Sequence, residues 1–276
     1  MNRDTRTTLA NERVADAALR GSVAAHSYVE PEEAQCLRPL ADLLDRPGGT
    51  RVSQVLFGDR LSVIERRRDH AFAQCLRDGY VGYIAEAALG PAVEPTHWVA
   101  VPTTHLYPKP AVRARAELAL YFGSEVRVIA ERDDYLRVHT RHFVPAAHLR
   151  PLRVRYNDPA GVAELFLGTP YLWGGGSRWG IDCSGLIQRA LEACGIPCPR
   201  DTDQQEATLG RALAPGEPLR RGDLVFWQGH VGIMLDATSL LHANGHHMAV
   251  AHEPVIEAIR RIGEGPAGPV TSRRRL

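Results

Sequence analysis

The chain has 276 residues, and its 44% hydrophobic content is enough to bury a sizeable core in two or three compact units. Its formal net charge is +1, a balance that points to neither nucleic acid nor an anionic membrane as a partner. The five cysteines, an odd number without a framework spacing, argue against a disulfide-stapled secreted domain and favour a reducing compartment. Cys194 and Cys198 are interpreted as thiols and not as a zinc site, because a single pair lacks the other ligands.

Residues 1–19 form an N-terminal segment without an apolar run, so the sequence predicts neither a secretory signal nor a membrane span. We therefore expect the protein in the cytoplasm. A different start site would be needed to add an export signal.

A diverged repeat occupies residues 20–151. The matching segments are 57–64 with 122–129, and 83–89 with 143–149. We expect each copy to open with a short strand, at 22–25 in the first and 98–101 in the second. Alternating strands between charged turns predict two small β-barrels, at 20–92 and 96–151. Both resemble bacterial SH3 domains, in which strands of the G-[DE]-x-[LV]-x-V-I and G-Y-I types recur.

The third expected unit covers residues 157–265, after a proline-bearing linker. The segment 160–167 has the apolar spacing of an amphipathic helix. We expect a strand pair at about 252–262 to close the sheet of this unit. The remaining tail, residues 266–276, is rich in Gly, Pro and Arg and is predicted to be loose.

Cys183 stands between a glycine-rich loop and an apolar-periodic segment. That segment, residues 186–194, predicts a helix that begins at or beside Cys183. Unpaired backbone N–H groups and the helix dipole favour a thiolate at such a position. A buried, inert role is a poor explanation for this cysteine, because the small polar residues Asp182 and Ser184 flank it.

The chain downstream of Cys183 contains histidines that are candidates for the catalytic base. Three apolar runs that each end in a turn predict a meander of strands at 222–227, 229–235 and 240–245. His230 lies on the second strand and His242 on the third. A cysteine at a helix start that faces a histidine on a sheet, with a second polar residue behind it, is the arrangement that thiol catalysis needs.

The chain resembles the NlpC/P60 cysteine peptidases, a branch of the papain-like fold, over residues 157–262. The resemblance rests on the motifs Y-L-W-G-G, D-C-S-G-L, P-R-D-T-D-Q-Q and H-V-G-I and on the later strand histidine. It implies an α+β protein in which a papain-like NlpC/P60 catalytic domain follows two small SH3-like β-barrels. Within the family the chain is most similar to the dipeptidyl-peptidase VI type, which cuts γ-D-glutamyl-L-diamino acid bonds in murein peptides and carries SH3-like domains.

The expected mechanism is attack by a Cys183 thiolate. His230 is expected to act as the general base and to form an ion pair with the sulfur, while His242 orients and polarises His230. A histidine is the usual third member in the resembled family. His246 and His247 lie beyond the next turn and are interpreted as surface histidines.

Substrate recognition requires a carboxylate if the pocket selects a free, cationic peptide amino terminus. The resemblance places Asp201 in that role, beside Thr202, where the family more often has a serine. Asp201 is also a candidate helix N-cap, and the two roles are compatible. Tyr171, Asp182 and Ser184 match other positions that line the family's pocket, and Tyr171 is a candidate oxyanion donor beside the backbone N–H of the nucleophile.

The segment D-G-Y-V-G-Y, residues 78–83, resembles one in SH3-bearing relatives whose first tyrosine caps the substrate pocket. The resemblance therefore implies that Tyr80 has this role and that the first barrel forms a wall of the active site, with Tyr83 at a position that packs in the barrel. The alternative is that Tyr80 is a packing residue and that the barrels are spacers or stability modules.

These observations predict a cysteine endopeptidase that hydrolyses the bond from γ-D-Glu to an L-diamino acid in short murein peptides with a free N-terminal L-Ala. We expect no cofactor, and imported wall fragments are the expected substrate in peptide recycling or turnover. The alternatives are a catalytically silent murein-binding module and an acyl- or amide-transferase that uses the same thiol. The diamino acid, the oligomeric state and the role of the second barrel stay open.

Overall fold

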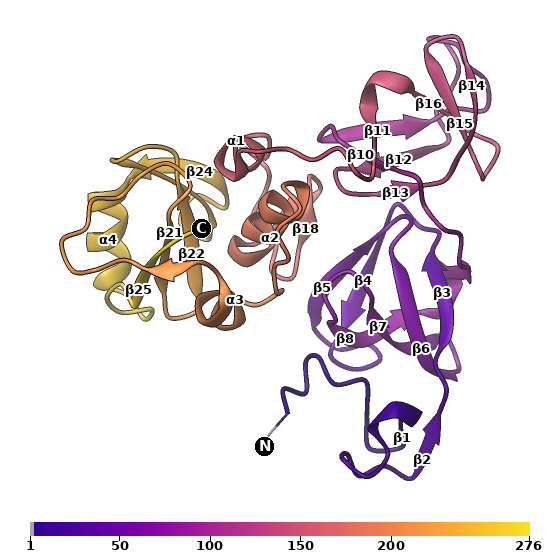
Figure 1. Ribbon diagram of the computed structural model, residues 1–276, viewed down its shortest axis with the longest axis horizontal. Helices are drawn as coiled ribbons and strands as arrows, with labels where there is room; N and C mark the ends of the chain where they lie inside the picture. The colour runs from indigo at the N-terminus through magenta and orange to yellow at the C-terminus, as the bar shows by residue number, and fades with distance from the viewer. Residues whose placement is uncertain (1–2) are drawn as a thin grey trace. The chain divides into compact units, whose positions relative to one another are not determined.

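The computed structural model describes residues 3–276 and divides into two compact units between Val154 and Arg155 (Figure 1). The division lies within the proline-bearing segment that separates the second barrel from the third unit in the sequence. The first unit is rich in β-sheet, and the second combines helices with a six-stranded sheet. No helix within residues 3–276 combines the length and the apolar character needed to cross a membrane.

The first part of unit 1 is a seven-stranded antiparallel sheet in the order β5-β4-β8-β7-β6-β3-β9. Its strands are β3 (Glu32–Cys36), β4 (Leu40–Leu44), β5 (Arg51–Leu56), β6 (Arg60–Arg67), β7 (His70–Cys75), β8 (Val81–Ala85) and β9 (Leu89–Pro91), with the 3₁₀ turn η2 (Glu86–Ala88). Ahead of it are a parallel pair, β1 (Val14–Asp16) and β2 (Ser27–Val29), and the turn η1 (Ala17–Leu19). Alternate residues of the sheet, including Leu43, Leu61 and Ile84, form its core.

The expected opening strand at residues 22–25 is wrong. These residues form a turn after η1, in which the N–H groups of Ser22 and Val23 both donate to the Leu19 carbonyl. The backbone donors are therefore used locally and are not available for a sheet. The sheet opens instead at β3, ten residues later than expected.

The second part of unit 1 consists of three small sheets, β13-β10-β17, β11-β12 and β14-β15-β16. Its elements are β10 (His97–Val99), β11 (Thr103–Leu106), β12 (Leu118–Tyr121), β13 (Glu125–Val126), β14 (Val128–Arg132), β15 (Tyr135–Val138), β16 (Phe143–Pro145), the turn η3 (Ala146–His148) and β17 (Leu149–Pro151). The predicted strand at 98–101 corresponds to β10, which begins and ends earlier.

Phe57 and Gly58, the first copy of the repeated Phe-Gly pair, join the two parts of unit 1. Phe57 leaves the end of β5 and packs in the core of the second part, with Leu106 and Leu120 among its partners. Its carbonyl accepts the N–H of Glu125 at 3.0 Å. Gly58 has a φ of +90°, and a Cβ atom there would lie 1.9 Å from the Glu125 carbonyl oxygen, so only glycine fits this close approach.

Unit 2 is built on a six-stranded antiparallel sheet in the order β20-β25-β21-β22-β23-β24. Its strands are β20 (Arg211–Ala212), β21 (Leu224–Trp227), β22 (His230–Met234), β23 (Ser239–Asn244), β24 (Ala249–Pro254) and β25 (Ser272–Arg275), with the separate hairpin β18 (Gly176–Ser177) and β19 (Gly180–Ile181). Its helices are α1 (Pro159–Glu164), α2 (Cys183–Ala193), α3 (Thr202–Thr208) and α4 (Val255–Gly263). The predicted meander is confirmed in β21, β22 and β23.

The two faces of this sheet are covered by different helices. Val225 and Trp227 point toward α4 and form a buried cluster with it, while α2 lies against β22 and β23 on the opposite side (Figure 1). Because side chains alternate along a strand, β21 is buried on both faces. The sheet therefore holds α2, and the residue at its first position, against β22 and β23.

The predicted strand pair at 252–262 is wrong, because β24 ends at Pro254 and α4 follows at once. The apolar residues of α4 recur with helical spacing: Ala258 is buried, and the partly buried Val255, Ile259 and Ile262 pack against the same cluster. With this spacing the apolar residues share one face of a helix, and that face packs on the sheet. In a strand, successive side chains point to opposite faces, so about half of these residues would face water.

The prediction of a loose tail at 266–276 is also wrong. Residues 272–275 form β25, which lies between β20 and β21 and pairs with both. Arg275 binds the carboxylates of Asp223 and Glu217 at 2.7 and 2.6 Å. The arginine-rich composition therefore supplies ion pairs that fasten an interior strand, rather than solvated charge.

We expect acid to weaken the attachment of this strand. The hydrogen bond from Arg211, with Arg275 nearby, lowers the pKa of Glu217 from 4.5 to about 2. Because the folded pKa is depressed, the stabilisation is fully present above about pH 4.5 and is lost as the pH falls toward 2. Melting temperatures of the protein and of Glu217→Gln should differ at pH 6 and converge near pH 2. A difference that does not change with pH would contradict this role.

Candidate active site

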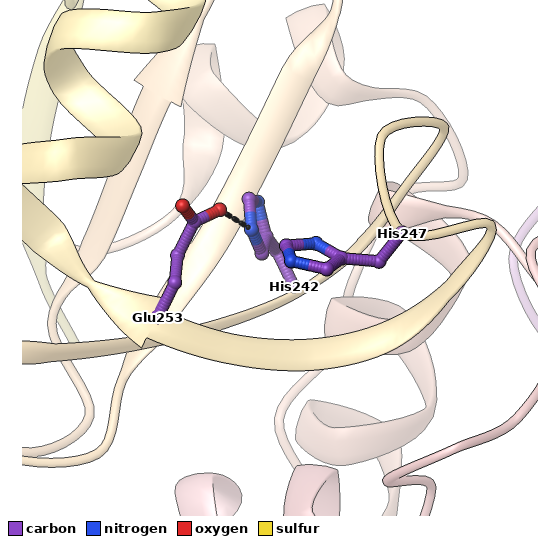
Figure 2. Close-up of side chains that lie close together, drawn as sticks. All are labelled: His242, His247 and Glu253. Atoms are coloured by element: carbon purple, nitrogen blue, oxygen red, sulfur yellow. Dashed lines mark hydrogen bonds and ion pairs between the residues drawn. The ribbon is translucent and has the colours of Figure 1, made fainter.

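His230 and His242 lie on the neighbouring strands β22 and β23, and their rings are joined. The Nε2 atom of His230 is 2.8 Å from Nδ1 of His242. The other nitrogen of His242, Nε2, is 2.7 Å from a carboxylate oxygen of Glu253, whose side chain lies beside the His242 ring in Figure 2. His242 is fully buried. The structure thus extends the predicted pair to a chain of three groups.

Glu253 was not identified from the sequence, although the strand pattern contains a signal for it. On β24, Ala251 is the direct partner of His242, and Glu253 lies two residues further along on the same face. Its carboxylate also binds Arg261 of α4. The hydrogen bond with His242 is the main reason that the pKa of Glu253 is lowered to about 2, so this group is a carboxylate at neutral pH.

The hydrogen bonds assign the tautomers of both histidines. A carboxylate only accepts, so the proton on His242 belongs to Nε2, which donates to Glu253. Nδ1 of His242 then accepts the N–H of His230 Nε2. Nδ1 of His230 is therefore unprotonated, as the nitrogen of a general base must be in order to accept a proton.

Cys183 is the first residue of α2, as predicted, and Asp182 is the N-cap. The Asp182 carboxylate accepts the N–H of Gly185 at 2.7 Å, which fixes the first turn of the helix. Cys183 itself is 7% exposed. Its position follows directly from the D-C-S-G order, because the cap places the next residue at the positive end of the helix.

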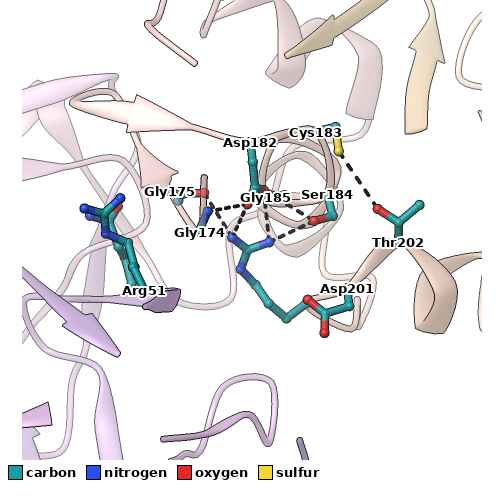
Figure 3. Close-up of polar contacts among 12 residues, drawn as sticks. Arg51, Gly174, Gly175, Asp182, Cys183, Ser184, Gly185, Asp201 and Thr202 are labelled. Atoms are coloured by element: carbon teal, nitrogen blue, oxygen red, sulfur yellow. Dashed lines mark hydrogen bonds and ion pairs between the residues drawn. The ribbon is translucent and has the colours of Figure 1, made fainter. Parts of the chain in front are cut away.

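A buried arginine, Arg200, holds this helix start in place, and Figure 3 shows the hydrogen bonds that meet at Asp182 and Ser184. Arg200 is 2% exposed and binds Asp182 at 2.7 Å and the Ser184 hydroxyl at 2.8 Å. The Asp182 carboxylate also accepts the N–H of Gly174 from the glycine loop at 2.8 Å. Asp182 and Ser184, predicted as pocket-lining residues, therefore direct their side-chain oxygens into this network. Arg200 was not identified as a site residue from the sequence. The signal for it is the Asp182 carboxylate, because a buried carboxylate needs a cationic partner.

The sulfur of Cys183 lies 3.9 Å from the carbonyl oxygen of Gly229 and 3.9 Å from the hydroxyl oxygen of Thr202. Within residues 3–276, no hydrogen bond joins the sulfur to His230. The expected ion pair between them is therefore not formed in this structure. Burial is the main reason that the pKa of the thiol is raised to about 11, and Asp182 adds to it, whereas the N–H of Val231 and the Thr202 hydroxyl lower the pKa.

The electrostatics of His230 explain why both groups are neutral here. Burial, followed by the nearby His242, lowers the pKa of His230 to about 3. Burial penalises a single charge on either partner, but two opposite charges in contact offset each other. Burial therefore disfavours an isolated thiolate or an isolated imidazolium at this position.

The predicted recognition residues near the sulfur come from two segments. Tyr171 is half-buried, and burial, together with the charges of Cys183 and Asp182, raises its pKa to about 12, so its phenol stays a hydrogen-bond donor at neutral pH. Asp201 caps α3 through a capping box with Gln204, as its alternative role predicts. Thr202, the first residue of α3, contacts the sulfur.

Tyr80 lies in unit 1, where it is 5% exposed and packs in the core of the first sheet with residues such as Leu43 and Ile84. Tyr83, on β8, packs its ring against Phe72 with centroids 4.9 Å apart. Packing explains the burial of both tyrosines. The pocket-capping role of Tyr80 stays a prediction.

Comparison with known proteins identifies similarity in both units. Residues 168–259 match the NlpC/P60 family, and residues 43–89 match the bacterial dipeptidyl-peptidase Sh3 domain. The first match contains Cys183, His230, His242 and Glu253, and the second contains Tyr80.

Two bacterial proteins named gamma-D-glutamyl-L-lysine dipeptidyl-peptidase are similar in sequence. The one from Bacillus subtilis is 29% identical over 217 residues, covering 69% of this chain and 71% of that protein. The one from Bacillus cereus is 26% identical over 227 residues, covering 69% of this chain and 66% of that protein. A solved NlpC/P60 family protein from Bacillus cereus has a similar fold, with a TM-score of 0.73 at 20% identity, over 88% of this chain and 99% of that one.

Proposed function

Because the chain contains an NlpC/P60 domain and a bacterial SH3 domain and is homologous to gamma-D-glutamyl-L-lysine dipeptidyl-peptidases, we propose that it is a cysteine peptidase of murein peptides. Its substrate is a short peptide with a free N-terminal L-Ala, and the bond that it hydrolyses joins γ-D-Glu to an L-diamino acid. The reaction belongs to the recycling or turnover of cell-wall peptides. The observation that supports this most strongly is the alignment of His230, His242 and Glu253 beside a cysteine at a helix start.

The first step is attack on the γ-carbonyl carbon. The thiol proton of Cys183 passes to Nδ1 of His230 as the sulfur forms a bond to that carbon, and the carbonyl oxygen becomes an oxyanion. The backbone N–H of Cys183 and the phenol of Tyr171 are donors for this oxygen. The positive charge on His230 is stabilised through His242 by the Glu253 carboxylate.

The second step releases the diamino acid. His230 gives its proton to the departing amine as the C–N bond breaks, which leaves an L-Ala-γ-D-Glu thioester on Cys183. Water, deprotonated by His230, then attacks the thioester, and the thiol is restored when the C–S bond breaks. Each proton that His230 takes is returned, so the cycle needs no other acid or base.

Selection of the free amine is assigned to Asp201. Its carboxylate lies at the N-cap of α3, next to Thr202, which contacts the sulfur. A cationic L-Ala amine gains a charge-assisted hydrogen bond there, and an acylated amine does not. Stems in intact sacculi have this amine blocked by the glycan and are therefore poor substrates.

This proposal can be tested by product analysis with three substrates: free L-Ala-γ-D-Glu-L-Lys, its N-acetylated form and intact sacculi. We expect the free peptide to yield L-Ala-γ-D-Glu and lysine with a kcat/KM about tenfold to a hundredfold above that of the acetylated peptide, the value of one hydrogen bond to a charged group. Asp201→Asn keeps an N-cap residue but removes the charge, so it should abolish the preference without loss of folding. Equal or faster release from sacculi would contradict the restriction to free peptides.

A further inference from the structure

His247 lies on the turn after β23, and its ring approaches the outer end of the histidine chain. One ligand atom from each of His242, His247 and Glu253 lies within 4.8 Å of the others. Figure 2 shows the two rings and the carboxylate grouped together. His247 is exposed, which confirms its interpretation as a surface histidine, but its position beside His242 was not predicted.

These three side chains offer the donor set of a zinc site. Two imidazoles and one carboxylate bind zinc in proteins with three protein ligands, and the fourth position is then open to water. Zinc bonds of about 2.0–2.2 Å hold tetrahedral ligand atoms roughly 3.3 Å apart, which is less than the 4.8 Å within which these donor atoms lie. His247, on an exposed turn, is the residue that can move inward to close the difference.

Both rings are already oriented by other groups. The amide oxygen of Asn244 accepts both the backbone N–H of His247 at 2.8 Å and its ring Nδ1–H at 3.1 Å, which leaves Nε2 to face outward as a ligand. The contact with His230 occupies Nδ1 of His242, so Nε2, which donates to Glu253 in this structure, is the nitrogen that a metal ion would take in place of the proton. Hydrogen bonds of this kind fix the ligand nitrogen and the ring plane in metal sites.

One neighbouring charge opposes a cation. Arg261 binds the same Glu253 oxygen that accepts from His242, so a metal ion must use the other oxygen or displace the guanidinium. The Arg261 side chain is 29% exposed and can turn into solvent. Removal of this charge should therefore strengthen metal binding.

We propose that His242, His247 and Glu253 form a binding site for a divalent transition-metal ion, with zinc as the first candidate, and that the bound ion switches off His230 as a base. The site is independent of the proposed peptidase activity, whereas the inhibitory effect rests on it. The cluster differs from a structural zinc site because one of its ligands, His242, also serves the proposed catalytic chain.

The switch follows from the position of two protons. Without metal, Nε2 carries the proton on both His242 and His230. Zinc takes the lone pair of His242 Nε2, so the proton of that ring must sit on Nδ1 and donate to Nε2 of His230. The proton of His230 is then on its own Nδ1, the nitrogen that has to accept the thiol proton. Each ring keeps one proton, and the base is blocked.

Binding is tested with zinc in the full-length Cys183→Ala protein, which lacks the thiol of the proposed active site as a competing ligand. In competition with a chromophoric chelator we expect one tightly bound equivalent. Addition of His247→Ala should weaken binding by about 100-fold or more, since even groups that only orient a ligand contribute 10–100-fold. His246→Ala is the matched control and should bind like its parent, whereas Arg261→Gln should bind more tightly. No binding, or equal binding by the His247→Ala protein, would overturn the site, and neither result depends on peptidase activity.

The switch is tested by the rate at which iodoacetamide alkylates Cys183 near neutral pH, which requires no substrate. Zinc should slow alkylation of the unmodified sequence and of His246→Ala, and should leave the rate of His247→Ala unchanged. An equal zinc effect in His247→Ala would show that the ion binds the thiol directly and would overturn the switch, as would a rate that zinc does not change in any of the proteins.

Discussion

Cys183→Ala is expected to lower kcat/KM for L-Ala-γ-D-Glu-L-Lys by about 10⁴-fold or more. Losses of this order are seen when the nucleophile of a catalytic triad is removed, because the triad residues act together. The sulfur is the protein atom that attacks the substrate carbon in the proposed reaction. It lies at the start of α2, while the fold depends on the helix and its Asp182 cap, both of which the alanine protein keeps.

Cys194→Ala is the matched control, because Cys194 is a free thiol at the other end of the same helix. It should keep nearly all of the activity. Both proteins should melt close to the temperature of the unmodified protein. Retention of more than a few per cent of activity by Cys183→Ala would show that another group attacks the substrate. Binding of the peptide without turnover by the unmodified protein would instead favour a silent murein-binding module.

Arg200→Met is expected to cost about 3–5 kcal/mol of unfolding free energy, because it leaves the Asp182 carboxylate buried without a cation. Methionine fills a similar length without charge. The loss also removes the hydrogen bonds from Arg200 to the Ser184 hydroxyl and to the Gly175 carbonyl of the glycine loop, so the position of Cys183 should become less fixed and kcat should fall as well.

Urea unfolding of two further proteins separates the charge effect from general disturbance. Arg221→Met breaks ion pairs to Asp158 and Glu164 that are exposed, and should cost less than about 1 kcal/mol. The double variant Asp182→Asn with Arg200→Met removes both charges and should recover part of the stability, since no unpaired charge stays buried. A double variant that is less stable than Arg200→Met alone would contradict this explanation.

The parts of the fold and site that were predictable from the sequence depend on local signals. The helix start at Cys183 follows from a capping residue and an apolar period, and the meander follows from short apolar runs that end in turns. The positions of His230 and His242 on adjacent strands then place their rings in contact.

The parts that were missed depend on contacts between distant segments. Residues 272–275 look like a solvated arginine tail until the edge of β21 and the carboxylates of Glu217 and Asp223 are in place. The helical period of α4 was overlooked because the segment follows a strand without a break. Arg200 and Glu253 are single polar residues whose partners lie 18 and 11 positions away, so these contacts form only when the chain folds.

The most direct measurement of the proposed chemistry is the mass of the intact protein after brief mixing with excess L-Ala-γ-D-Glu-L-Lys and quenching in acid. We expect an adduct with the mass of the L-Ala-γ-D-Glu acyl group, located by peptide mapping on Cys183 and absent from Cys194. An adduct that retains lysine, or one carried by any other residue, would contradict a Cys183 thioester formed by cleavage after γ-D-Glu.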